Sequence, residues 1–133
     1  MLRMDLEQAL RLANRNMVGF DLALGTGALL APDLTLRALG HNEPAPDARE
    51  LFRRCGPIWL TFAAAHAVAE HRGEPRDWWA LAWLRGTELF TDVLWSRSSS
   101  FTRLGARPGL WLAGAANLAM AAGFAKLSRS RRR

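Results

Sequence analysis

The chain has 133 residues, half of them hydrophobic, with 18 Lys and Arg residues against 12 Asp and Glu residues. This length allows one domain, and the single cysteine excludes an internal disulfide and any metal site built from several cysteines. The cationic excess favours nucleic acid or an anionic membrane surface as a partner. Because five of the cations fall in the last eight residues, most of the excess is a basic tail over residues 126–133.

Residues 2–15 place apolar side chains at helical spacing, which predicts a short amphipathic helix lying on a surface or entering a membrane. Four apolar segments follow, over residues 16–36, 51–71, 78–96 and 108–126. Crossing ~30 Å of hydrocarbon takes roughly 20 helical residues. The fourth segment meets that standard and the second nearly does. The first and third contain charged residues and would fail a strict hydropathy criterion alone.

The connections between these segments are short and contain glycine, proline and serine, which is typical of turns between neighbouring helices. We therefore expect an all-α fold in a single domain over residues 1–133. The expected architecture is an integral membrane up-down four-helix bundle preceded by the short N-terminal amphipathic helix. The alternative is a water-exposed bundle, whose helices would show a wide polar face. The second and fourth segments show none, which favours the membrane.

An even number of spans leaves both termini on one side of the membrane. With the termini inside, ten Lys and Arg residues flank the spans on the inner side and seven on the outer side. The positive-inside rule then favours a multi-pass protein of the cell (inner) membrane with both termini cytoplasmic. We expect the basic tail to contact anionic lipid headgroups and not nucleic acid.

The third segment carries its ionisable residues on one face. Residues on this face recur at alternating spacings of three and four: Trp78, Leu81, Arg85, Glu88, Asp92 and Trp95. Ionisable residues in a span usually face the bundle interior, so we expect this face to point inward. The opposite face suits lipid and consists of Trp79, Trp83, Phe90 and Leu94.

Asp21 and His66 lie about as deep in their segments as Arg85 does, so the three side chains are expected at one level. We predict that Arg85 pairs with Asp21 or Glu88, because an unpaired buried charge would cost several kcal/mol. The candidate polar residues are Asp21, His66, Glu70, Arg85, Glu88, Asp92 and Asn117. They form either a polar pocket or proton-handling site, or a set of clamps that fixes helix packing. The near balance of charge favours the clamps.

The fourth segment carries small residues at helical spacing, namely Ala115, Ala119 and Gly123. They predict close helix packing or a contact between copies of the chain. His66 and His71 lie five residues apart and diverge on a helix, so no metal site is expected. No cofactor is expected either.

Two stretches resemble small bacterial DoxX-like membrane proteins. They are Gly25 to Gly40 (GTGALLAPDLTLRALG) and Glu50 to Gly56 (ELFRRCG), about a third of the chain together with their surroundings. The resemblance implies a four-helix membrane bundle whose first helix ends with a segment rich in Gly, Leu and Pro. Members of that family include accessory subunits of quinone-linked oxidoreductases and many proteins of unknown role, so no catalytic residue is implied.

The expected function is that of a non-catalytic accessory subunit that packs against a larger membrane complex or a second copy. The alternative is a membrane-embedded enzyme or lipophilic-ligand binder that uses the polar cluster. A cavity that reaches Asp21, His66 and Glu88 would favour the alternative, and a closed polar core would favour the accessory subunit. A soluble helical binding protein is the third possibility.

Overall fold

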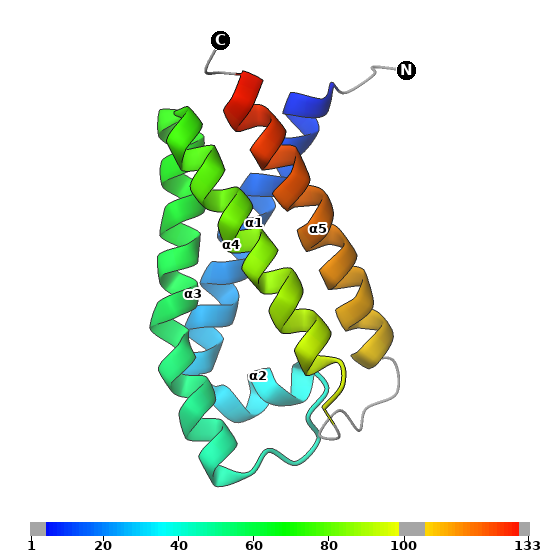
Figure 1. Ribbon diagram of the computed structural model, residues 1–133. Coiled ribbons are helices and arrows are strands. Elements are labelled where there is room, and N and C mark those ends of the chain that lie inside the picture. Colours follow the sequence, from blue (N-terminus) through cyan, green and yellow to red (C-terminus); the bar gives the residue numbers. More distant parts are fainter. Residues whose placement is uncertain (1–4, 99–105, 131–133) are drawn as a thin grey trace.

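The computed structural model describes residues 5–98 and 106–130, which are helical apart from short turns. The helices are α1 (Leu6–Leu30), α2 (Pro32–Ala38), α3 (Pro46–Arg72), α4 (Pro75–Trp95) and α5 (Ala106–Ser130). The four long helices alternate in direction, so both termini lie at one end of the bundle and α2 lies at the other (Figure 1). The start of the expected amphipathic helix (residues 1–4), part of the last connection (99–105) and the end of the basic tail (131–133) lie outside the described residues.

Helix α1 differs from the sequence expectation, because the amphipathic segment and the first apolar segment form one continuous helix. A capping box opens it: Gln8 N donates to Asp5 Oδ1 at 2.7 Å, and Asp5 N donates to Gln8 Oε1 at 3.2 Å. The expected end at residue 36 is also wrong. Helical geometry stops at Ala31, because the residue before a proline is disfavoured in the α conformation. Pro32 then starts α2 as a separate helix.

Proline and glycine also set the boundaries of the other helices. Pro46 and Pro75 occupy the first turns of α3 and α4, where the missing backbone N–H costs nothing. Gly73 ends α3 in the left-handed region at φ 65°, a conformation that glycine adopts without strain. The expected segments at 51–71, 78–96 and 108–126 thus lie within or almost within the observed helices.

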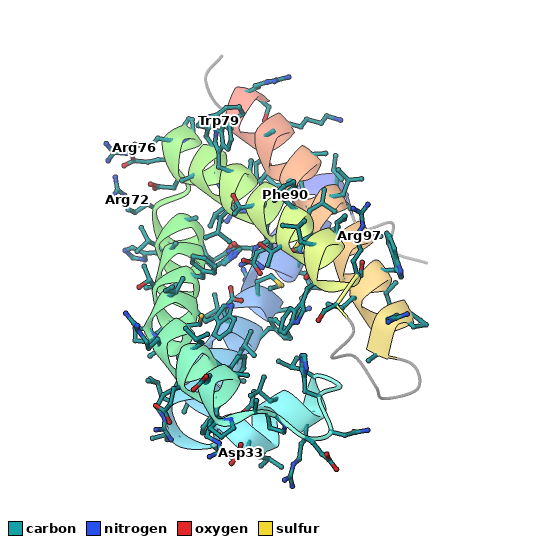
Figure 2. The ribbon with its side chains drawn as sticks, turned by 60° about the horizontal axis from the view of Figure 1, so that its bottom comes forward. Asp33, Arg72, Arg76, Trp79, Phe90 and Arg97 are labelled. Carbon is teal, nitrogen blue, oxygen red and sulfur yellow. The ribbon has the colours of Figure 1, made fainter. Side chains whose placement is uncertain are left out.

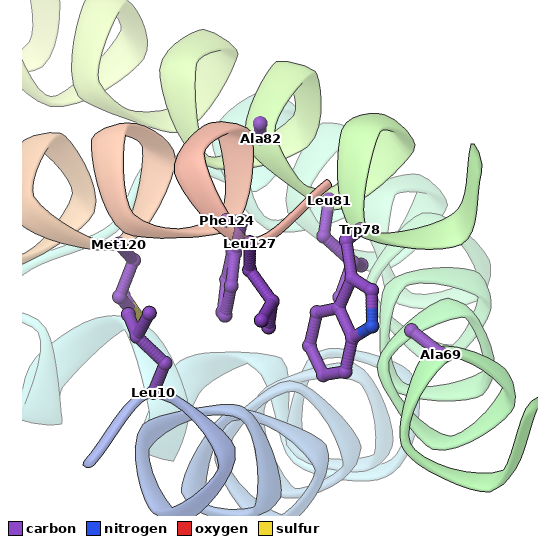
Figure 3. Close-up of a cluster of buried hydrophobic side chains, with 8 residues drawn as sticks. All are labelled: Leu10, Ala69, Trp78, Leu81, Ala82, Met120, Phe124 and Leu127. Carbon is purple, nitrogen blue, oxygen red and sulfur yellow. The ribbon is translucent and has the colours of Figure 1, made fainter. Parts of the chain in front are cut away.

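The bundle is built from two helix pairs, α1 with α3 and α4 with α5. Two glycines bring α1 and α3 together: a Cβ on Gly25 would lie 2.8 Å from the carbonyl oxygen of Gly56. The pairs meet toward the termini in an apolar cluster that spans all four long helices (Figure 3). Its buried members are Leu10, Ala69, Trp78, Leu81, Ala82, Met120, Phe124 and Leu127.

The outer surface is unusually apolar. Figure 2 shows Trp79 and Phe90 on α4, with Arg72 and Arg76 before them and Arg97 after them. Sixteen large hydrophobic side chains are exposed in the part of the chain that the structure describes. By length and composition, α5 is the one described helix that could cross a membrane.

Candidate functional site

The centre of the bundle holds a buried ion pair between α1 and α4. Arg85 Nη2 donates to Asp21 Oδ2 at 2.7 Å, and each side chain is 2% exposed. Of the two partners expected for Arg85, Asp21 is the one it contacts. Trp78 and Leu81 are buried on the same face of α4, so this face points inward as expected from its spacing. The pair therefore links the two helix pairs at mid-bundle.

His66 from α3 extends this pair, and Asn14 holds it in place. His66 is fully buried, and its Nε2 lies 3.8 Å from Asp21 Oδ2. Its Nδ1 lies 2.6 Å from Asn14 Oδ1, while Asn14 Nδ2 donates to the His66 carbonyl at 3.1 Å. Since the amide nitrogen of Asn14 is the donor to that carbonyl, Oδ1 is the acceptor and His66 Nδ1 carries the proton. Asp21, His66 and Arg85 therefore lie at one level, as their depths predicted.

Asn14 is the residue of this cluster that sequence reasoning missed. It sits four residues after Leu10 and seven before Asp21, and both neighbours share its buried face. This spacing is visible in the sequence once residues 6–30 are treated as one helix. Dividing the segment at residue 15 hid it.

Glu70 lies one turn beyond His66, toward the termini, and is bound by N-terminal cations. Its Oε1 accepts from Arg15 at 2.9 Å and lies 3.5 Å from Arg11 Nη1. Asn14 Nδ2 also reaches Glu70 Oε2 at 3.4 Å. Glu70 thus belongs to the end of the bundle, and Asn14 connects it to the His66 group.

A cavity of about 660 Å³ lies beside the ion pair, in the half of the bundle nearer α2. This volume is within the range of small-molecule sites. The cavity reaches Arg85 and Glu88, while Asp21 and His66 stay behind its wall. Its polar wall also contains Asp92, whose Oδ2 accepts from Asn117 Nδ2 at 2.9 Å. Apolar side chains make up most of the rest: Met17, Phe20, Leu24, Leu39, Trp59, Trp95, Leu110 and Met120.

Two donors or acceptors of the polar wall are left without partners. Among residues 5–98 and 106–130, Glu88 makes no hydrogen bond or ion pair, and buried Arg85 Nε has no hydrogen-bond partner. Buried polar groups are normally satisfied, so the unpartnered Arg85 Nε is unusual, whereas the half-buried Glu88 side chain lines the cavity. In the same described ranges, no three His, Cys, Asp or Glu side chains come together to hold a metal ion.

The small residues of α5 lie in two different environments. Gly123 packs against Leu10 of α1, since a Cβ added there would collide with the leucine side chain. Ala115 and Ala119 are exposed. A contact between these two alanines and a partner stays a prediction.

The fold and the site together define an all-helical protein with one possible membrane-crossing helix, a buried ion pair and an adjoining cavity. Comparisons with models of known families, with characterised proteins and with solved structures give no match. The DoxX-like resemblance therefore stays an expectation from the sequence.

Proposed function

We propose that this chain is a multi-pass membrane protein whose four long helices cross the inner membrane and whose central cavity binds a lipophilic ligand. Both termini lie on the cytoplasmic side in this proposal. The observation that carries it is the distribution of polarity, with ionisable groups inside the bundle and apolar side chains outside.

A band free of exposed charge supports the membrane assignment. It comprises residues 17–30, 55–69, 78–95 and 108–125, one stretch from each long helix. The Asp, Glu, Lys and Arg residues within these stretches are Asp21, Arg85, Glu88 and Asp92, and none of the four is exposed. A soluble bundle has the opposite arrangement, with polar outer faces. Lipid-facing surfaces require apolar side chains outside and paired ionisable groups inside.

Three of the four exposed threonines in this band satisfy their own hydroxyl groups, Thr26 being the exception. Thr61, Thr87 and Thr91 each donate to the backbone carbonyl four residues earlier, at 2.9, 3.0 and 3.1 Å. A hydroxyl in lipid has no water to bond with, so an intrahelical acceptor removes the cost of its burial. These bonds suit an apolar environment.

The band is long enough to span a thin bilayer. Its stretches of 14 to 18 residues correspond to roughly 21–27 Å, compared with ~30 Å of hydrocarbon. Arginine side chains at the ends can extend to the interface, and local thinning accommodates the difference at modest cost. α5 alone meets a hydropathy criterion. Such a criterion counts the inward ionisable residues of α4 against it, and the charge-free stretch of α3, residues 55–69, is shorter than a full span.

Cations gather at the end of the bundle that holds the termini. Arg11 and Arg15 contact Glu70, and Arg72 contacts Glu74 and Asp77 in the turn between α3 and α4. A hydrogen bond to Glu74, with the charges of Asp77 and Glu74, raises the pKa of Arg72. Together with the basic tail, this cationic end suits the cytoplasmic side and its anionic headgroups.

The cavity meets in part the criterion set for a ligand binder, since it reaches Glu88 while Asp21 and His66 lie behind its wall. A cluster that serves only as helix clamps needs no space beside it, yet here Arg85 and Glu88 face an open volume. The second candidate remains an accessory subunit docked in the membrane. It is favoured by the aromatic outer face of α4, where Trp79 and Trp83 make an edge-to-face contact, and by the exposed Ala115 and Ala119.

Charge insertion tests the membrane assignment. Trp83 is 67% exposed near the middle of the band, and Leu34 is 70% exposed on α2, outside it. In a membrane, Trp83→Arg costs about 2.5–3.5 kcal/mol of insertion free energy and should sharply reduce the fraction resistant to alkaline carbonate extraction. The matched control Leu34→Arg should leave that fraction unchanged. A Trp83→Arg protein that stays folded and soluble without detergent would refute the assignment, since exposed surface substitutions in water change stability by about 0.5 kcal/mol or less.

A blocked cavity tests the ligand. Ala113 is exposed and lines the cavity, whereas Ala122 is exposed on the same helix outside it. Native mass spectrometry of protein purified in mild detergent should detect a bound lipophile that Ala113→Trp removes and Ala122→Trp retains. Equal occupancy in both variants would contradict ligand binding in this cavity.

A further inference from the structure

The charge at the polar wall of the cavity is unbalanced. Arg85 faces three carboxylates, but its Nη2 is already bound to Asp21, at 2.7 Å. Asp92 accepts from the neutral amide of Asn117, and Glu88 has no hydrogen-bond or ion-pair partner among the described residues. Two carboxylates therefore lack a cation. In an apolar environment, carboxylates left in this way must either bind protons or be paired with a cation from outside the chain.

The aromatic wall favours the same sign of charge. Phe20, Trp59 and Trp95 line the cavity together with Glu88 and Asp92. The faces of aromatic rings attract cations, and Trp does so most strongly. Carboxylates and indole rings around one volume select an ammonium group and repel an anion.

Arg85 contributes no ligand contact through its unpaired donor. Its side chain is 2% exposed and its Nε is buried, so a ligand in the cavity does not reach that atom. The carboxylates of Glu88 and Asp92 are therefore the polar groups that determine the head group.

On the basis of the proposed ligand-binding role, we infer that the cavity takes an amphiphilic amine. Its ammonium group donates to Glu88 and Asp92, and its apolar body lies along Phe20 and Trp59. The chemical class is that of long-chain alkylamines.

Probes with one chain length and different head groups test this inference on the unaltered full-length protein. They are dodecylamine, 1-aminododecan-2-ol, dodecan-1-ol, dodecanoate and N-acetyldodecylamine. Binding is measured by isothermal titration at pH 7 in a neutral maltoside detergent, with partition into empty micelles subtracted. Because charge-assisted hydrogen bonds contribute about 1.5–3 kcal/mol, the amine should bind roughly 10- to 100-fold more tightly than the alcohol or the acetylated amine. Dodecanoate should bind most weakly, and the amino alcohol should bind about as tightly as the amine.

Variants then assign the head group to its partners. Glu88→Gln should reduce affinity for dodecylamine at least tenfold and leave affinity for dodecan-1-ol unchanged. The matched control is Glu50→Gln on α3, which pairs with Arg53 and lies outside the cavity. It should leave both affinities unchanged. If Glu88→Gln does not fold, the comparison of dodecylamine with its acetylated form on the unaltered protein still decides.

The outcomes separate this inference from the function on which it rests. Equal binding of amine, alcohol and acetylated amine, all lost in Ala113→Trp, would overturn the amine and retain the lipophile. No binding of any probe, and no bound lipophile in the purified protein, would overturn the proposed function itself.

Discussion

Removing either partner of the Asp21–Arg85 pair should destabilise the protein in a different way. Asp21→Leu leaves a buried guanidinium, which has no means of losing its charge because arginine stays protonated in proteins. Arg85→Met leaves a buried carboxyl, which can take up a proton. The double variant replaces both groups with apolar side chains of similar size. The three variants together separate the cost of an unpaired charge from the net value of the pair.

The distance between the two charged groups allows the stability changes of these variants to be estimated. At 2.7 Å and an effective dielectric constant of 20, the attraction within the pair is about 6 kcal/mol. Removing two ions from water costs several kcal/mol each, so the net contribution of the pair is close to zero. Asp21→Leu should therefore lower the free energy of unfolding by about 3–5 kcal/mol, and the double variant should lie within about 1 kcal/mol of the unaltered protein.

The cost of Arg85→Met should depend on pH. Protonating an aspartyl side chain in water costs about 4 kcal/mol at pH 7 and about 1.4 kcal/mol less for each unit of lower pH. In this variant the folded state binds one proton that the unfolded state lacks between pH 5 and 7. The free energy of unfolding therefore falls as pH rises, so the penalty at pH 5 should be about 2–3 kcal/mol smaller than at pH 7. The penalty of Asp21→Leu should not change.

Far-UV circular dichroism during denaturation in mixed micelles measures these free energies. Each variant is compared with the unaltered protein at the same pH. A double variant whose cost equals the sum of the two single costs would refute the pairing, because partners in contact are not additive. A pH-independent penalty for Arg85→Met would refute the buried position of Asp21.

Two further predictions use the same measurement. Gly25→Ala should lower the free energy of unfolding by about 1–3 kcal/mol, because the new Cβ would lie 2.8 Å from the carbonyl oxygen of Gly56. Gly86 has nothing described within 4 Å of such a Cβ, so Gly86→Ala should raise the free energy of unfolding by up to about 1 kcal/mol through its higher helix propensity. Equal effects at the two glycines would contradict the close crossing of α1 and α3. His66→Ala should lower the free energy of unfolding by about 1–3 kcal/mol, because it leaves Asn14 Oδ1 unpaired. The double variant with Asn14→Ala should cost less than the two single variants added together. Strictly additive costs would contradict the contact between the two residues.

Periodicity in the sequence was sufficient to predict α3, α4 and α5 and the inward face of α4. Both depend on local regularities, namely the three-and-four spacing of Arg85, Glu88 and their neighbours and the glycine and proline residues at the turns. The contact of Arg85 with Asp21 was predicted as one of two possibilities, because in an up-down bundle the depth of a residue can be estimated from its position along its helix.

Four features of the structure were harder to predict from the sequence. The continuity of α1 required the recognition that nothing in residues 6–30 breaks a helix, whereas the change of composition near residue 15 suggested a boundary. The role of Asn14 followed from that continuity. The separate helix α2 depends on one conformational restriction at Ala31, before Pro32. The cavity depends on how far the two helix pairs separate, which no single segment encodes.

The proposed span of α4 is compatible with its failure to meet a hydropathy criterion for a physical reason. Hydropathy averaged over a window counts each ionisable residue as though it faced lipid. In α4 the side chain of Arg85 is instead buried against Asp21, and Glu88 and Asp92 are turned toward the cavity. The free energy of placing such residues in a membrane depends on their partners. A helix with three inward ionisable residues and an aromatic outer face can therefore cross a membrane at a much smaller free-energy cost than its average hydropathy indicates. The same reasoning makes Trp83→Arg decisive, because a charge on the outer face has no partner inside the bundle.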